Sequence, residues 1–439
     1  MGPILPVPRI DPWPHHSHNQ TRGPGFNDKV ASVLKPALDK MNLSPRLQRL
    51  LGLALLLALL LAAVQLVFGL VVVGREFSAA PPPKITWSSP NLLVDRARLD
   101  AIKAAVQKND PVLTPAFQDL VRTAEGMLAD APNPILGDLM VPGFYTAGRE
   151  TQQRITRQLR TDARKSHALA LAHALTGRAE FADKSRAILF AWMNSLKRPV
   201  NGGHWWEVFW LGHRGDTPLV ISYSFPAFLY AFDLLKGENM LRPVEMDAFR
   251  AWLRPYVDYL SGEVLYKNNH HNWQVVFLLC AAHVLEDPAL FDRAVGYYRN
   301  GLRGQIRGDG ALPRELWRKE KCGTYTLMAL EGMVQAVHIA EQHGYDRLRT
   351  LRSNKGGTLE KALDFYLQYL KDPAAWAKHT NAPKLNAPND PSDWGYVFEV
   401  PYAWWRNPDY LPYMQKRPYG YAVERCYTLD FATLLFAGR

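Results

Sequence analysis

The sequence predicts an all-α domain of antiparallel helical hairpins, preceded by one transmembrane helix. Apolar residues recur at helical spacing in one segment after another between residues 96 and 370. Strand-like alternation is scarce, and residues 50–74 form a run of leucine, valine and alanine without charge. Hairpins of this kind close into a toroid or stack into a solenoid, and no fixed repeat period favours the solenoid.

The N-terminal part is expected to be a tail and a membrane anchor. Residues 1–48 are rich in Pro, His, Asn and basic residues and lack apolar periodicity, which is typical of a disordered tail. Residues 50–74 exceed the roughly 20 apolar residues that span a bilayer. Because basic residues outnumber acidic ones in the tail, the positive-inside rule keeps the tail in the cytosol.

This arrangement predicts a single-pass type II membrane protein whose main domain is extracellular or lumenal. The alternative, a core helix of a soluble protein at residues 50–74, requires burial on every face of that helix. Residues 75–91 contain three consecutive prolines and are expected to be a stiff linker. The folded domain is then expected at residues 92–439.

Helical spacing of apolar residues places ten helices in this domain. They are predicted at residues 96–108, 115–129, 157–175, 181–196, 222–235, 243–261, 273–285, 289–306, 325–343 and 359–370. Residues 381–421 are dense in Pro, Asp, Trp and Tyr. This last segment is expected to pack as ordered irregular structure over the domain, where it could form one wall of a cleft.

The overall composition excludes fewer possible functions than the motifs do. The net charge of +11 suits a polyanionic partner, but solubility or attraction to a membrane surface explains it equally well. The three cysteines allow at most one disulfide, so a disulfide framework is excluded.

Residues 268–273, Asn-Asn-His-His-Asn-Trp, are predicted to open a helix. Asn268 or Asn269 would cap it, and Trp273 would begin its apolar stripe. Taken alone, Asn269 is a capping residue and His270 a buried histidine. Their combination with the next motif favours a functional interpretation.

The second motif covers residues 312–318, Leu-Pro-Arg-Glu-Leu-Trp-Arg, and continues to Tyr325. Arg318 and Tyr325 are seven residues apart, about two turns of a helix with roughly 3.6 residues per turn, so they would share one face. Both side chains could therefore line one cleft.

Together the two motifs resemble those of the alginate lyase family, polysaccharide lyase family 5 and its wider superfamily. The resemblance rests on Asn-Asn-His-x-x-Trp at residues 268–273, Asp-Gly-x-Leu-Pro-Arg-Glu-Leu-x-Arg at residues 309–318, and a tyrosine seven residues later. It favours an incomplete α/α toroid and implies cleavage of an acidic polysaccharide by β-elimination. Residues 321–326, Lys-Cys-Gly-Thr-Tyr-Thr, depart from the family pattern around the tyrosine, so the choice among alginate, glucuronan and related substrates stays open.

The resemblance also implies a role for each motif residue. Asn269 would neutralise the uronate carboxylate, His270 would assist as neutraliser or base, and Arg318 would hold the carboxylate or orient the tyrosine. Tyr325 would act as general acid and also as base. A proton beside a carboxylate becomes removable only when donors mask the carboxylate charge, which explains these residue types on chemical grounds.

A tyrosine titrates near about 10 and needs nearby cations to favour its phenolate. Further substrate contacts are expected from two loop regions and the motif helices. These candidates are His204, Trp205, Trp206, His213, Arg214, Arg314, Lys321 and Trp273. Tryptophans in a Gly-rich loop serve either as platforms for sugar rings or as a plug in the toroid.

Two other functions are alternatives to the lyase. A glycoside hydrolase on the same scaffold needs two carboxylates across the scissile bond, and Glu207, Asp216 and Glu315 are the candidates. A polysaccharide-binding protein without catalysis would keep only the aromatic cleft. The expected partners are an acidic polysaccharide and, through residues 50–74, a lipid bilayer; no nucleic acid, metal or cofactor is expected.

Overall fold

The computed structural model describes residue 44 and most of the chain from residue 82 onward. The described ranges are 82–201, 215–262, 264, 267–380, 382, 384–415, 417–421, 423 and 425–438. The chain divides into two units, Met1–Pro81 and Pro82–Arg439, and the second carries the fold. The expected tail at residues 1–48 and membrane helix at residues 50–74 lie outside the described residues, apart from Ser44.

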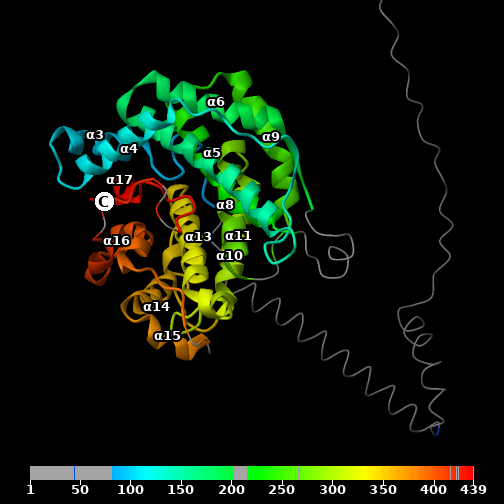
Figure 1. Ribbon diagram of the computed structural model, residues 1–439, viewed down its shortest axis with the longest axis vertical. Helices are drawn as coiled ribbons and strands as arrows, with labels where there is room; N and C mark the ends of the chain where they lie inside the picture. Colours follow the sequence, from blue (N-terminus) through cyan, green and yellow to red (C-terminus); the bar gives the residue numbers. More distant parts are fainter. Residues whose placement is uncertain are drawn as a thin grey trace, which may run out of the picture. The chain divides into compact units, whose positions relative to one another are not determined.

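The second unit is mostly helical, as predicted (Figure 1). Its longer helices are α3 (Arg96–Gln107), α4 (Leu113–Met127), α5 (Arg149–Thr176), α6 (Ala179–Ser195), α8 (Thr217–Gly237), α9 (Pro243–Leu260), α10 (Asn269–Leu285), α11 (Pro288–Gln305), α13 (Cys322–Gln342) and α14 (Leu359–Lys371). All ten predicted helices are present. The largest differences are at the starts of α5 and α8, which begin at Arg149 and Thr217 instead of residues 157 and 222.

Short elements complete the described part of the unit. They are α12 (Pro313–Leu316), α15 (Pro373–Thr380), α16 (Glu399–Trp405), α17 (Ala432–Phe436), the 3-10 helices η1 (Lys319–Lys321), η2 (Leu348–Thr350), η3 (Pro391–Phe398) and η4 (Pro408–Met414), and the strands β1 (Gly137–Met140) and β2 (Leu196–Val200). The two strands pair in parallel, so the all-α prediction is wrong at this one point. Each strand is too short for the alternation that a sequence pattern needs.

Helix α8 lies at the centre of the packing, against α5 on one side and α10 on the other, and α10 packs in turn against α13. Among the described residues, α8 is the one helix long and apolar enough to cross a membrane, yet 89% of its most apolar stretch is buried inside the protein. A helix that is apolar on all faces needs such burial. Its composition therefore reflects its place in the core.

The two ends of the described unit meet. Helix α17 packs against α3 and α4 (Figure 1), and the buried guanidinium of Arg98 donates to the carbonyls of Leu434, Leu435 and Ala437 at distances of 3.0, 2.8 and 2.6 Å. These carbonyls at the end of α17 have no partner within their own helix, so an arginine satisfies them. Residues 381–421 form η3, α16 and η4, short turns in place of a long helix pair, in line with the irregular packing that was predicted.

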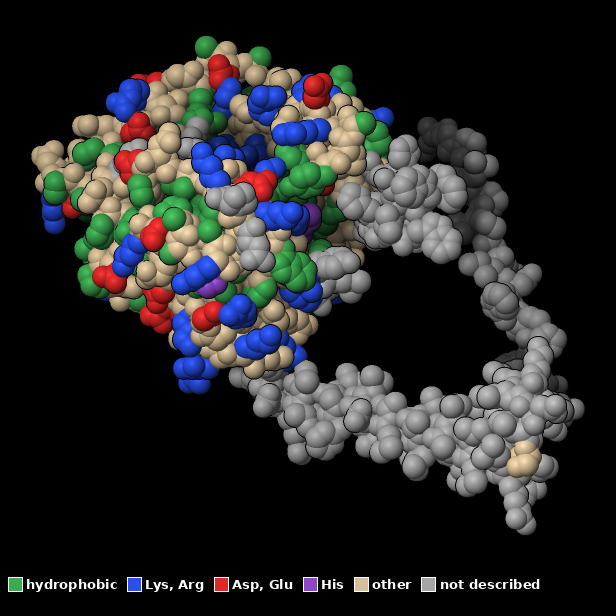
Figure 2. All heavy atoms as spheres, turned by 60° about the horizontal axis from the view of Figure 1, so that its bottom comes forward, with side chains coloured by type: hydrophobic (Ala, Val, Ile, Leu, Met, Phe, Trp, Pro, Cys, Tyr) green, Lys and Arg blue, Asp and Glu red, His purple; other side chains and the backbone are tan. Residues whose placement is uncertain are grey.

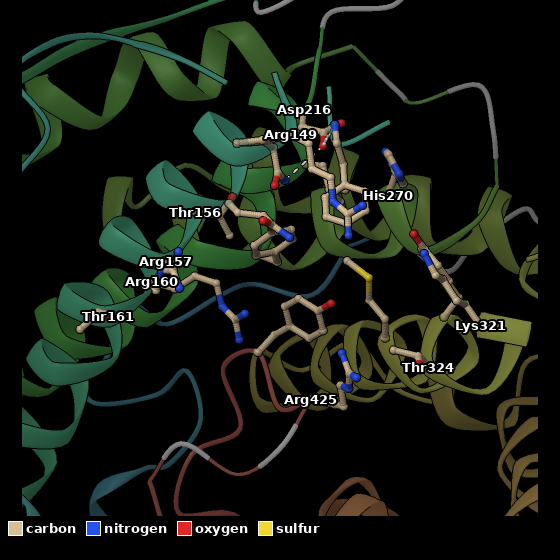
Figure 3. Close-up of a pocket in the computed structure, with 18 of the residues that line it drawn as sticks. Arg149, Thr156, Arg157, Arg160, Thr161, Asp216, His270, Lys321, Thr324 and Arg425 are labelled. Atoms are coloured by element: carbon tan, nitrogen blue, oxygen red, sulfur yellow. Dashed lines mark hydrogen bonds between the residues drawn. The ribbon is translucent and has the colours of Figure 1, made fainter. Parts of the chain in front are cut away.

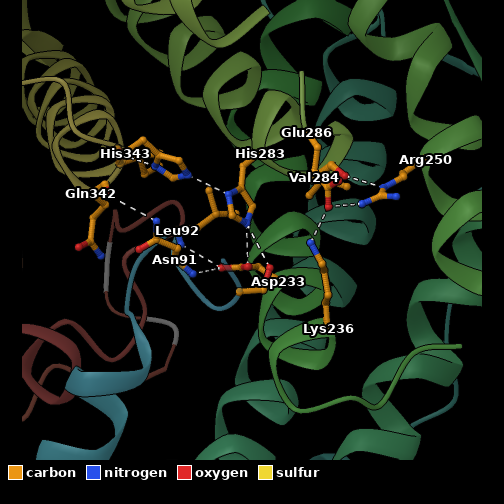
Figure 4. A network of polar contacts seen from close by, with 12 residues as sticks. Asn91, Leu92, Asp233, Lys236, Arg250, His283, Val284, Glu286, Gln342 and His343 are labelled. Carbon is orange, nitrogen blue, oxygen red and sulfur yellow. Dashed lines mark hydrogen bonds and ion pairs between the residues drawn. The ribbon is translucent and has the colours of Figure 1, made fainter. Parts of the chain in front are cut away.

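A buried polar network fixes the segment before α3 to the helices (Figure 4). Asp233 on α8 accepts hydrogen bonds from the backbone N–H groups of Asn91 and Leu92 (2.7 and 2.9 Å) and contacts His283 on α10 (2.8 Å). His283 in turn contacts His343, just after α13 (2.8 Å). One carboxylate thus joins three helical regions to the start of the domain.

Candidate active site

A cleft of about 1030 Å³ opens between α5, the first turns of α10 and α13, and the C-terminal loop (Figure 3). Its described lining is dominated by cations from several elements, and Figure 2 shows Lys and Arg side chains gathered around a hollow in the surface. They are Arg149, Arg157, Arg160, Arg164, Lys165, Arg318, Lys321 and Arg425, joined by His270. Asp216 is the one carboxylate of this lining, so the cleft concentrates positive potential suited to a polyanion.

Helix α5 supplies most of these cations. Gln153, Arg157, Arg160 and Arg164 are spaced by four, three and four residues, which places them on one face of the helix. These cations were not predicted as site residues, because charged residues on a helix usually indicate a solvent-exposed face. Their helical spacing is the signal that could have identified them.

Tyr325 and Tyr145 form the centre of the cleft wall. Their hydroxyl oxygens are 2.7 Å apart, and the guanidinium carbon of Arg318 lies 4.7 Å from the centroid of the Tyr325 ring. The ammonium of Lys321 lies 5.6 Å from the centroid of the Tyr145 ring. Arg318 and Tyr325 do line one cleft, but Arg318 precedes η1 and lies outside α13, so the predicted shared helix face is wrong. Tyr145 lies 180 residues away in sequence and was not predicted.

Tyr325 is expected to act as a general acid and also as a base, and its surroundings favour the protonated phenol. Burial raises the pKa of Tyr325 well above its ordinary value, and the hydrogen bond and charge of Tyr145 raise it further, whereas Arg318 lowers it less. The phenol is therefore protonated in the free protein. This state suits a proton donor, and burial opposes the phenolate that Arg318 favours.

Asp216 holds the segment that carries Tyr145. Its Oδ2 accepts hydrogen bonds from the backbone N–H of Phe144 (2.9 Å) and from the side-chain amide of Gln152 (3.2 Å). The carboxylate is therefore engaged in positioning the cleft wall. His270, in the first turn of α10, lines the cleft as predicted.

Asn269 does not line the cleft, in contrast to the predicted contact with the substrate. Its side chain is fully buried, and its backbone N–H and its Nδ2 donate to the two carboxylate oxygens of Glu315 (2.7 and 2.9 Å). Asn268, not Asn269, caps α10 by accepting from the N–H of His270. Asn269 therefore ties the start of α10 to α12, since a carboxylate is favoured at a helix N-terminus.

Glu315 is a buried acid beside the cleft. Burial raises its pKa to about 7, although the hydrogen bonds from Asn269 and the charges of Arg318 and Arg314 act in the opposite direction. Glu315 does not line the cleft, and neither does Arg314. Of the hydrolase candidates within the described residues, only Asp216 does.

Trp273 is a core residue, so its prediction as a substrate contact is wrong. The indole is fully buried and its Nε1 donates to the carbonyl of Met328 (3.0 Å). Lys321 does line the cleft. The remaining candidates, His204, Trp205, Trp206, His213, Arg214 and Glu207, lie outside the described residues.

Two other features bear on cofactors and redox state. In the described ranges, no group of three or more His, Cys, Asp and Glu side chains is arranged to hold a metal ion. Cys280, Cys322 and Cys426 are free, buried thiols.

Comparisons with known proteins agree with the motifs. The sequence profile of the family described as alginate lyase matches residues 100–376. An alginate lyase of Pseudomonas syringae pv. tomato is 30% identical over 136 residues, 31% of this chain and 34% of that protein. An alginate lyase of Cobetia marina is 33% identical over 106 residues, 24% of this chain and 27% of that protein. The match thus spans about a third of the length of these curated relatives.

Solved structures share the fold over a larger part of the chain. An alginate lyase from Bacteroides ovatus superposes with a TM-score of 0.64 at 18% identity and covers 80% of this chain and 100% of that one. Alginate lyase A1-III from Sphingomonas species A1 gives a TM-score of 0.61 at 18% identity, with 81% and 98% covered. At this identity the likeness concerns the fold.

Proposed function

The chain belongs to the alginate lyase family, and from this premise we propose that it is a polysaccharide lyase that cleaves a uronic-acid-containing polysaccharide by β-elimination. The observation that carries the proposal is the hydrogen-bonded pair of Tyr325 and Tyr145 beside Arg318, in a cleft lined mainly by cations. Alginate and glucuronan-like polymers are the proposed substrates. A structure of alginate lyase A1-III complexed with tetrasaccharide supports a saccharide chain as ligand.

The reaction requires a masked carboxylate and a proton donor. Arg318, His270 and Lys321 would surround the uronate carboxylate and stabilise the negative charge that develops when the C5 proton leaves. The C4–O bond then breaks, a C4–C5 double bond forms, and Tyr325 protonates the leaving oxygen. Because the Tyr325 phenol is protonated, His270 takes the C5 proton.

We propose that the helices form an incomplete α/α toroid, and their arrangement supports this. The central helices α8, α10 and α13 are largely buried, and α9, α11 and α14 each bury only one face. Inner and outer helices that alternate along the chain are what helical hairpins in a ring require.

We propose that residues 50–74 anchor the protein in a membrane as a type II single-pass protein. The support is the uncharged apolar run and the basic residues before it. The lyase domain would then face the exterior or a lumen. Glycosylation or protease protection in sealed vesicles tests this orientation, and cleavage of the domain by external protease on sealed cytosol-out vesicles would contradict it.

The test of the reaction is ultraviolet absorbance of unsaturated uronate during incubation of the protein with a panel of polyuronates. A rise with one polymer supports β-elimination and identifies the substrate. New reducing ends without that absorbance would favour a hydrolase, which needs a second carboxylate besides Asp216. Binding without either product would favour a polysaccharide-binding protein.

A further inference from the structure

A buried carboxylate on α13 holds the C-terminal wall of the cleft. Glu331 is fully buried, and its Oε1 accepts hydrogen bonds from the backbone N–H groups of Tyr427 and Thr428 at 2.9 Å each. Its Oε2 accepts one from the hydroxyl of Tyr396 at 2.9 Å. A carboxylate that receives several donors in this way fixes the segments that supply them.

The segment held by Glu331 is residues 425–428, and it is strained at the cleft. Arg425 has a φ of 63°, in the left-handed region that residues with a Cβ rarely adopt. The carbonyl oxygen of Arg425 lies 3.1 Å from the hydroxyl oxygen of Tyr396 and shares its single proton with Glu331. Strained conformations of this kind persist only where neighbouring contacts determine them, and they concentrate at functional sites.

A second contact holds the same segment from the opposite wall. The Nη2 of Arg160 on α5 donates to the carbonyl of Cys426 at 2.8 Å, and its guanidinium carbon lies 4.6 Å from the centroid of the Tyr427 ring. Arg160, Arg425 and Tyr427 all line the cleft. The segment is therefore held between the buried carboxyl group of Glu331 and a cleft arginine, with Arg425 and Tyr427 presented to the cleft.

We propose that Glu331 is a positioning residue that sets the substrate affinity of the cleft by holding Arg425 and Tyr427 in its wall. The inference rests on the proposed function, because it takes the ligand to be a polyuronate. Glu331 itself touches no ligand, since it is fully buried behind the wall. Its effect should therefore appear in KM, through Arg425, and not in the proton transfer at Tyr325.

The test is a double-mutant cycle in the full chain with the polyuronate that the wild type cleaves. Glu331→Gln removes the charge at similar size, and Arg425→Gln removes the guanidinium. We expect each variant to raise KM by roughly 10-fold, the size of a lost hydrogen bond to a charged group, with kcat nearly unchanged. We expect the double variant to be no worse than the weaker-binding single variant.

Four outcomes would overturn the inference. Effects of the two substitutions on KM that multiply would show that Glu331 does not act through Arg425. A folded Glu331→Gln with wild-type KM would remove the positioning role. A loss of kcat with unchanged KM would point to the chemical step. The fourth outcome comes from a control, Glu399→Gln.

Glu399 is a matched buried carboxylate away from the cleft. It accepts hydrogen bonds from Thr433 (2.7 Å) and Arg417 (2.9 Å), and it lies on α16. Glu399→Gln should lower stability and leave KM unchanged. An equal rise in KM in this variant would show that general destabilisation explains the effect.

A milder variant keeps the test decisive if Glu331→Gln does not fold. Tyr396→Phe removes only the hydroxyl that bonds both Glu331 and Arg425, and it keeps the ring in the core. It should raise KM in the same direction, and a wild-type KM would overturn the proposal. If the wild type forms no unsaturated product, the proposed function fails. The same double-mutant cycle is then measured with dissociation constants for alginate oligosaccharides, obtained by calorimetry.

Discussion

The cleft and the Asp233 network place ionisable residues in opposite ways. Cations dominate the described lining of the cleft, and Arg164 and Lys165 among them pair with Asp430 and Asp130 beyond that lining. In the network, Asp233 and His283 are both almost fully buried and contact each other directly. Charge is balanced where solvent is always excluded, and surplus charge remains where a ligand can supply the opposite sign.

The hydrogen bonds of the network determine its protonation. The Nδ1 of His343 faces the carbonyl of Ile339 (2.7 Å) and must donate, and burial followed by the charge of His283 lowers the pKa of His343 to about 4. The Nε2 of this neutral ring therefore accepts from the Nδ1 of His283. Since the Nε2 of His283 donates to Asp233, His283 carries both ring protons and forms a buried ion pair.

We expect the cleft to control catalysis and the Asp233 network to control stability. The largest expected effect is on turnover, through the cleft. Tyr325→Phe should lower turnover by roughly 10² to 10⁴, with binding nearly intact, because a phenyl ring cannot transfer the proton. Initial rates of unsaturated product formation measure this loss. Tyr298→Phe is the control, since that hydroxyl is buried without a hydrogen-bond partner among the described residues. Wild-type turnover in Tyr325→Phe would refute the assignment.

The second prediction concerns a substitution that disrupts the Asp233 network and leaves the cleft unchanged. Asp233→Asn leaves the His283 charge buried without its counterion, so the free energy of unfolding should fall by about 3–5 kcal/mol. Urea denaturation measures the change, and turnover per folded molecule should stay as in the wild type. Glu286→Gln, which affects the half-exposed contacts with Lys236 and Arg250, should cost at most about 1 kcal/mol. Equal losses in both variants would contradict the buried ion pair.

The third prediction concerns the surplus charge on α5. Arg157→Ala should raise KM by about 10-fold and weaken the dependence of KM on salt, because one charged contact with the polyanion is lost. Kinetics at low and high ionic strength test both effects. Arg122→Ala removes an exposed arginine paired with Asp119 and should change neither. An unchanged salt dependence in Arg157→Ala would show that this cation does not face the substrate.

The smallest effect is a pH dependence of stability from His343. Its pKa is about 4 in the folded protein and about 6.5 when unfolded, so below pH 6.5 the unfolded state binds the extra proton. The contribution of His343 is thus complete above about pH 6.5 and is lost as pH falls toward about 4. The free energy of unfolding lost in this way amounts to roughly 1 kcal/mol at about pH 5.5. His343→Gln should weaken the dependence of the free energy of unfolding on pH in this range. An identical pH dependence in the variant and the wild type would argue against a buried neutral ring.

The sequence by itself determined the helical class, the ten main helices and the pairing of Arg318 with Tyr325 in one cleft. These features depend on apolar periodicity and on residues a few positions apart, which are local properties. It also supplied the motifs on which the resemblance to the alginate lyase family rests. The start of α5 was placed too late because its first residues, Arg149 to Arg154, are all polar or charged and show no apolar stripe.

Only the tertiary structure decided which polar residues face the cleft. Asn269 and Trp273 belong to the recognisable motif but are buried, because Glu315 and the carbonyl of Met328 take up their polar groups. Tyr145 and Arg425 reach the cleft of Tyr325 from distant parts of the chain. Such contacts form only when packing and hydrogen bonds hold distant segments together, and spacing along the sequence carries no record of them.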